Sequence, residues 1–128
     1  MQEFPDCFPD DFILPENAGF YEQNNVYRIL PYGNLDRNGF LPTYEDNIIK
    51  RIPQPVKPNA STYSTSCAAS IDYLKNILQV HFRGLPAACI ARGTILPKCG
   101  PSTLPNKNSH IDWWIYKDAE PELYFEKV

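Results

Sequence analysis

Residues 110–114, HIDWW, bring a titratable ring, a carboxylate and two indoles together in one short segment. The alternation of residue types predicts a strand in which His110, Asp112 and Trp114 share one face while Trp113 faces the core. An aspartate on the same face can orient one ring nitrogen of a histidine and leave the other nitrogen free for a ligand. We therefore expect a core anchor at Trp113 and a recognition edge at His110, Asp112 and Trp114.

A basic side chain could complete this edge, because Arg92 lies in another segment with strand character. Tryptophan and arginine are among the residue types that dominate binding surfaces. The segment 97–109 between them is rich in Pro, Ser, Asn and Lys, as expected of a surface loop. We predict a recognition surface that comprises Arg92, this loop and the following segment to Trp114.

Histidine and cysteine side chains could also bind a metal, and the candidates are His81, Cys89, Cys99 and His110. Their spacing matches none of the ligand patterns of zinc proteins, and no two cysteines form a C-x-x-C pair. We therefore expect no metal site. All four cysteines are expected to be reduced and partly buried, because a free cysteine packs as a small apolar residue.

Cys67 could serve as a nucleophile, since it precedes the clearest helical segment and a helix dipole lowers the pKa of a thiol at its N-terminus. His81 or His110 would then be the base, and Asp112 would orient it. The sequence lacks the glycine-flanked turn that usually presents such a nucleophile. We favour the alternative, in which Cys67 is a small packing residue in the turn that enters the helix.

Three further groups of residues follow one another along the chain: Arg28 in VYRIL, Ser64, Thr65 and Ser66 in YSTSC, and Glu122 or Glu126 in EPELYFE. Their order resembles the Arg, Ser-Thr-Ser, Glu layout of ADP-ribosyltransferases. The resemblance implies that Arg28 holds the phosphates of NAD and that the serine motif braces the nicotinamide. It also implies that Glu126, or Glu122, stabilises the developing oxocarbenium ion. Arginine suits the first role because its guanidinium binds phosphate in a bidentate manner.

The composition limits the classes of partner. The net charge is −3 and there is no basic block, which argues against binding to duplex nucleic acid. The apolar runs are too short to span a bilayer, and the acidic N-terminal stretch lacks the features of a signal peptide. We expect a bacterial, cytoplasmic protein with no membrane partner and no duplex nucleic-acid partner.

Periodicity and turn signals predict the elements that must position these residues. Strands are expected at 25–30, 87–96 and 110–116, with Gly93 marking a bulge, and 122–128 is a closing strand or short helix. A short helix is expected at 44–50 with Thr43 as its N-cap, and a longer one at 69–82 capped by Ser66 or Ser70.

The thirteen prolines concentrate in an extended N-terminal arm, 1–24, and in a linker loop, 53–60, among other loops. Together these elements predict a single α+β domain over 1–128. A small mixed or antiparallel sheet would be packed by one main helix and framed by proline-rich loops.

Two functions are compatible with these patterns. The first is a binding module for a protein or a small molecule, with its recognition surface around 97–114 and no cofactor. It requires His110 and Trp114 to be partly exposed beside a concavity. The second is an ADP-ribosyltransferase-like enzyme that uses NAD, and it requires Arg28, Ser64 and a C-terminal glutamate to converge on one cleft.

Overall fold

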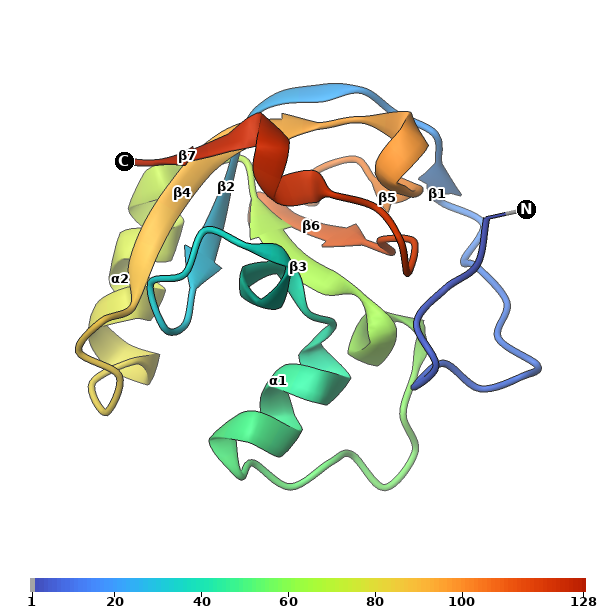
Figure 1. Ribbon diagram of the computed structural model, residues 1–128, viewed down its shortest axis with the longest axis horizontal. Coiled ribbons are helices and arrows are strands. Elements are labelled where there is room, and N and C mark those ends of the chain that lie inside the picture. The colour runs from blue at the N-terminus through green and yellow to red at the C-terminus, as the bar shows by residue number, and fades with distance from the viewer. Residues whose placement is uncertain (1) are drawn as a thin grey trace.

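A computed structural model describes residues 2–128. Its architecture is α+β, with one curved, antiparallel sheet of seven strands in the order β1-β5-β6-β3-β2-β4-β7 and two α-helices (Figure 1). The strands are β1 (Ala18–Gly19), β2 (Gln23–Leu30), β3 (Thr65–Ala68), β4 (Cys89–Ile95), β5 (Ser102–Thr103), β6 (His110–Trp113) and β7 (Phe125–Lys127). The helices are α1 (Thr43–Lys50) and α2 (Ile71–His81), and the short 3-10 helices are η1 (Arg37–Phe40), η2 (Ala60–Tyr63), η3 (Pro97–Cys99) and η4 (Pro121–Tyr124).

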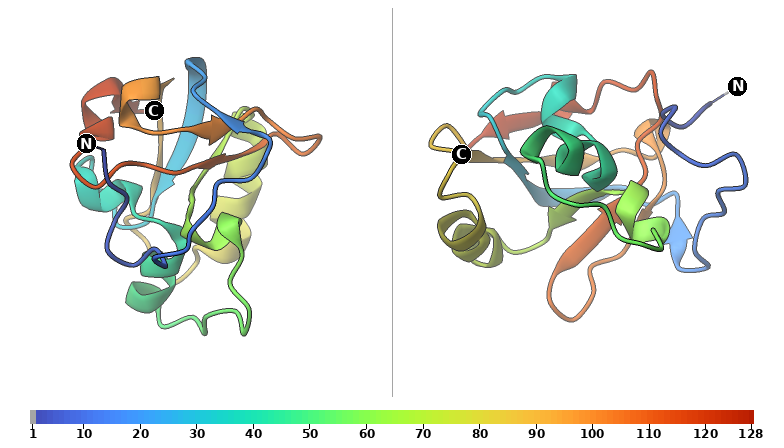
Figure 2. Two further views of the ribbon diagram at one scale, coloured as in Figure 1. Left: turned by 90° about the vertical axis from the view of Figure 1, so that its right-hand side faces the viewer. Right: turned by 90° about the horizontal axis from the view of Figure 1, so that it is seen from below.

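Side chains of β2 alternate between two apolar clusters, as the sequence predicts. Val26 and Leu30 lie in the larger cluster with Trp113 and Phe125, and this cluster is covered by loops and 3-10 helices instead of a long helix. Ile29 faces the opposite side of the sheet, where it packs with Leu74 of α2. Figures 1 and 2 show α2 along the β2–β4 end of the sheet and α1 beneath the middle of the molecule.

Both predicted helices form, with small differences at their N-termini. The Ser70 hydroxyl caps α2 by accepting a hydrogen bond from the backbone N–H of Tyr73 at 3.4 Å. Of the two predicted N-cap residues, Ser66 and Ser70, the structure therefore uses Ser70. The prediction for Thr43 is wrong by one position, because Pro42 occupies the N-cap of α1 and Thr43 is the first helical residue. Its backbone N–H is instead satisfied by the carbonyl oxygen of Ser64 at 2.8 Å.

The predicted bulge exists on the neighbouring strand. Val26 of β2 pairs with Gly93 of β4, and the next pair is Gln23 with Ile95. Three steps along β2 therefore match two steps along β4, so β2 carries the extra residue of the bulge. Asn25 adopts a left-handed φ of 56° at this bulge. Gly93 allows the backbone of η4 and the Phe125 ring to pack closely against β4. A Cβ at Gly93 would come within 2.4 Å of the Phe125 ring and still closer to the backbone of η4.

Three strands were not anticipated. β1 and β5 have only two residues each, so they leave no periodic pattern in the sequence. β3 was interpreted as the turn before the helix, but Thr65–Ala68 pairs with all four residues of β6. The strand predicted at 110–116 is shorter than expected, since β6 ends at Trp113. The segment 122–128, predicted as a closing strand or a short helix, contains the end of the 3-10 helix η4 followed by β7.

The N-terminal arm is folded into successive turns where an extended course was expected. Backbone hydrogen bonds close turns from Pro5 to Phe8 and from Pro9 to Phe12, at 3.1 and 3.0 Å. The turns place Phe4 in a stacked contact with Phe8, with ring centroids 5.0 Å apart. Phe8 and Phe12 also pack against Tyr63, which attaches the arm to η2.

Candidate functional site

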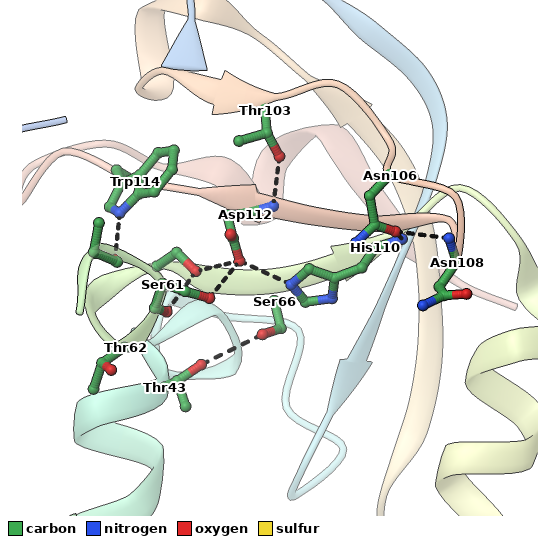
Figure 3. Close-up of polar contacts among 12 residues, drawn as sticks. Thr43, Ser61, Thr62, Ser66, Thr103, Asn106, Asn108, His110, Asp112 and Trp114 are labelled. Atoms are coloured by element: carbon green, nitrogen blue, oxygen red, sulfur yellow. Dashed lines mark hydrogen bonds and ion pairs between the residues drawn. The ribbon is translucent and has the colours of Figure 1, made fainter. Parts of the chain in front are cut away.

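The predicted pairing of His110 with Asp112 is present on β6 (Figure 3). His110 Nε2 lies 2.8 Å from Asp112 Oδ1, and the side chains are 29% and 19% exposed. The hydroxyls of Ser64 and Ser61 donate to the same oxygen from 2.9 and 3.0 Å. Asp112 therefore connects β6 to the segment that contains η2 and the start of β3.

The chemistry of this cluster follows from its hydrogen bonds. Partial burial by itself raises the pKa of Asp112, but the hydrogen bonds from His110, Ser64 and Ser61 outweigh it and hold the pKa below its ordinary value. An ionised carboxylate only accepts hydrogen bonds, so His110 must carry its proton on Nε2. In the neutral ring this leaves Nδ1 as a free acceptor.

The cluster is not arranged as a nucleophilic triad. In such a triad the histidine lies between the carboxylate and the hydroxyl, whereas here Asp112 lies between His110 and Ser64. The single proton of the Ser64 hydroxyl is shared between Asp112 Oδ1 at 2.9 Å and the carbonyl oxygen of Ser61 at 2.8 Å. The arrangement orients an imidazole and leaves the serines unactivated.

Arg28 occupies a gap between β2 and β3. These strands pair only at Tyr27 and Ala68, and beyond that point they separate. The Arg28 guanidinium fills the gap: it donates to the carbonyl oxygens of Ser66 and Gly39, each at 3.1 Å, and to Asp46 of α1 at 3.0 Å. Both charged side chains are buried, with exposures of 6% and 8%.

A cavity of about 250 Å³ lies beside this gap, between α1, α2 and the sheet. Its polar lining includes Thr43, Ser66 and His110, and the hydroxyls of Thr43 and Ser66 are 3.4 Å apart. Its apolar wall comes from β2 and α2 and includes Ile29, Leu74, Ile77 and Phe82. The cavity thus combines an apolar wall with a few polar groups held by the backbone of regular elements.

Lys50 ends α1 at the cavity wall. Its Nζ lies 5.0 Å from the centroid of the Phe82 ring, so the side chain reaches from α1 to the end of α2. Burial lowers the pKa of Lys50, and only part of this effect is offset by the charge of Asp46. Within residues 2–128, no carboxylate forms an ion pair with Lys50.

Two members of the expected recognition edge lie elsewhere. Trp114 is fully buried: β6 ends before it, its backbone N–H donates to Pro101, and its indole N–H donates to the carbonyl oxygen of Ala60 at 2.9 Å. The expectation that Trp114 faces outward is therefore wrong, while the burial of Trp113 is confirmed. Arg92 is separated from β6 by β2 and β3 and pairs with Glu126.

The residues of the ADP-ribosyltransferase layout do not converge. Ser66 and Arg28 line the cavity, and Ser64 binds Asp112 nearby, but Glu126 lies on the edge strand β7 in an exposed pair with Arg92. Arg28 has its donors engaged by Asp46 and two carbonyl oxygens. Thr65 is buried and donates to the carbonyl oxygen of Phe40, and Glu122 lies in η4. The Arg28 contacts that the structure shows are therefore internal to the fold.

The nucleophile hypothesis for Cys67 also lacks its structural basis. Cys67 lies within β3, not at a helix N-terminus, and it is 1% exposed. Burial raises its pKa to about 12. Within the part of the chain that the structure describes, the histidine, cysteine and acidic side chains form no group of three that could hold a metal ion.

Comparison with known proteins adds no family. No family model matches this chain, and neither the curated proteins nor the solved structures contain a significant match. No helix in residues 2–128 has the length and apolar character needed to cross a membrane.

Proposed function

We propose that this protein is a small-molecule-binding module and that its ligand site is the cavity between α1, α2 and the gap between β2 and β3. The observation that supports this proposal most strongly is the composition of the cavity wall. Ligand sites in proteins are mostly apolar concavities with a few fixed polar groups. Ile29, Leu74 and Ile77 provide the first property, and Ser66 and His110 provide the second.

The proposal keeps the binding function expected from His110 and Asp112 but moves the site. The recognition region is the inner side of β6 and β3 where it meets the helices, in place of the loop at 97–109. His110 is the shared element, because it lines the cavity and is oriented by Asp112 from the same strand. Asp112 engages only Nε2, so the other ring nitrogen, Nδ1, is left for a ligand.

The volume indicates a small ligand. Typical ligand cavities measure about 300–1,000 Å³, and this one, at about 250 Å³, lies just below that range. A ligand with a short apolar body and one polar end fits this space.

A thermal-shift screen of small amphipathic molecules on the wild-type protein and on Ile77→Trp tests the proposal. Ile77 is only partly buried, so the indole would enter the cavity without replacing a fully buried core side chain. A ligand at a hundredfold over its Kd stabilises the folded state by about 2.7 kcal/mol. We expect such stabilisation in the wild type and its loss in Ile77→Trp.

Val80→Trp is the matched control, because Val80 lies on the same helix but is 51% exposed and does not line the cavity. This variant should retain the ligand response. Equal loss in both variants, or equal retention in both, would place the site elsewhere.

A further inference from the structure

Some of the charged side chains that line the cavity already form an ion pair with each other, whereas Lys50 does not. Asp46 and Arg28 bind each other at 3.0 Å in a buried pair, so they cancel at short range. Two further N–H groups of Arg28 donate to backbone carbonyl oxygens. Lys50 is the cationic side chain of the lining that this pair leaves uncompensated.

Lys50 is held in this position by its surroundings. The side chain is half-buried, and its ammonium group lies over the Phe82 ring at 5.0 Å. Burial disfavours the charged ammonium, as the lowered pKa of Lys50 indicates. A ligand anion beside Nζ would return part of the electrostatic stabilisation that the ammonium loses on leaving water.

Hydroxyl donors from the first turn of α1 and from β3 also line the cavity. The hydroxyls of Thr43 and Ser66 hydrogen-bond each other at 3.4 Å, and a ligand oxygen that displaces this bond can accept from both. A carboxylate has two acceptor oxygens and suits a site with one ammonium group and hydroxyl donors. The apolar wall formed by Leu74, Ile77 and Phe82 suits an aliphatic or aromatic body.

We infer that the cavity selects small apolar carboxylates, with Lys50 as the residue that recognises the carboxylate. This inference rests on the proposed function, because it specifies the ligand class of the same cavity. The apolar wall then provides the affinity, and Lys50 distinguishes a carboxylate from a neutral molecule of the same shape.

Isosteric pairs of probes separate these two contributions. Phenylacetate and hexanoate are titrated against phenylacetamide and hexanamide, in low salt at pH 7, and the Kd values are measured by NMR. For the wild type we expect each carboxylate to bind at least about tenfold more tightly than its amide, which corresponds to about 1.4 kcal/mol. Lys50→Met keeps the apolar stem, and in this variant the ratio should fall to about one.

Lys75→Met is the control for net charge, because Lys75 is an exposed residue of α2 that does not line the cavity. It should keep the wild-type ratio. If the carboxylates and amides bind the wild type equally, the inference is wrong and the proposed binding function survives. If neither class binds, the proposed function fails and the inference fails with it. A ratio that persists in Lys50→Met would show that another group recognises the carboxylate.

Discussion

Asp112 accepts three side-chain hydrogen bonds through a single oxygen atom, from His110, Ser64 and Ser61. Its charge therefore fixes the histidine tautomer and joins β6 to the segment before β3. Asp112→Asn preserves the shape but removes the charge, and hydrogen bonds to a charged acceptor are worth about 1.5–3 kcal/mol against about 1 kcal/mol for neutral ones. We expect the variant to be less stable by about 1–2 kcal/mol at pH 7, measured by urea unfolding.

The pH dependence of this difference provides a second test. The folded-state pKa of Asp112 lies below the ordinary value of 3.8, so the aspartate adds stability at every pH above 3.8, and this contribution is lost as the pH falls through the folded-state pKa. The gap in unfolding free energy between wild type and Asp112→Asn should be present at pH values well above 3.8. Below pH 3.8 the gap should narrow. A gap that stays constant or widens in acid would contradict the assignment.

Cys67 should be chemically inert in the folded protein. Its thiol is 1% exposed and its pKa is raised to about 12 by burial, so at pH 8 roughly one thiol in ten thousand would be ionised. Iodoacetamide labelling followed by peptide mass spectrometry should leave Cys67 unmodified in native protein and modify it fully in urea. Equal labelling rates in the two conditions would show that β3 is not buried as described.

The sequence predicts some residue positions correctly because their neighbours impose a period. The alternation in 110–114 places His110 and Asp112 on one face and Trp113 in the core, as observed. Trp114 departs from the pattern because β6 ends at Trp113 and the chain bends to donate to Pro101. Periodicity cannot show where a strand stops when apolar residues continue beyond its end.

At the scale of elements, Arg28 and Asp46 attach α1 to the sheet through a buried ion pair. Removal of one partner leaves an uncompensated buried charge, which typically costs about 3–5 kcal/mol. Arg28→Met should therefore reduce the free energy of unfolding by about this amount, as measured by chemical denaturation.

Arg92→Met provides the matched control, since Arg92 and Glu126 form a pair at the same distance of 3.0 Å but with side-chain exposures of 47% and 70%. Exposed pairs contribute about 0–1 kcal/mol, so this variant should be nearly as stable as the wild type. Equal costs for the two substitutions would contradict the structural role of the Arg28 pair.

Among the elements of the candidate site, β3 is harder to predict from the sequence than the two helices. α1 and α2 have caps and apolar spacing that can be recognised locally, whereas β3 is defined by pairing with β6, a segment more than forty positions away. Thr43, Asp46 and Lys50 carried no signal as site residues, because on their own they resemble the polar face of a surface helix. Their partners on β2, β3 and α2 become apparent only in the folded chain.

At the scale of the whole molecule, the N-terminal arm is attached by a cluster of aromatic rings. Phe8 contacts Phe4, Phe12 and Tyr63, with ring centroids separated by 5.0, 4.8 and 5.4 Å. Phe8→Ala should release the arm at a cost of about 1–3 kcal/mol, because it removes buried apolar surface and ring contacts. Limited proteolysis should then cut within residues 2–16 faster than in the wild type.

Phe20→Ala serves as the control for this variant, because Phe20 lies near the end of the arm, outside the aromatic cluster, and is 64% exposed. Its substitution should leave the cleavage rate unchanged. Faster cleavage in Phe20→Ala, or an unchanged rate in Phe8→Ala, would mean that the aromatic cluster does not hold the arm.

The α+β class and a small sheet, mixed or antiparallel, follow from composition and local patterning, but the closure of the cavity depends on the whole chain. α1, α2 and three strands each provide part of the wall, and Arg28 joins them where β2 and β3 separate. Such a gap has no signature in the sequence, because it arises from strand pairing that does not continue. The site is therefore a property of the assembled fold.

The most direct test is a methyl NMR titration of Ile-, Leu- and Val-labelled protein with phenylacetate. The methyl groups of Ile29, Leu74 and Ile77 line the cavity, while those of Ile13 and Val128 are 82% and 67% exposed at other places and serve as internal references. The account predicts saturable shifts at the three cavity residues, with one common Kd, and no shift at the references. Shifts confined to other residues, or no saturable shift at Ile29, Leu74 and Ile77, would contradict it.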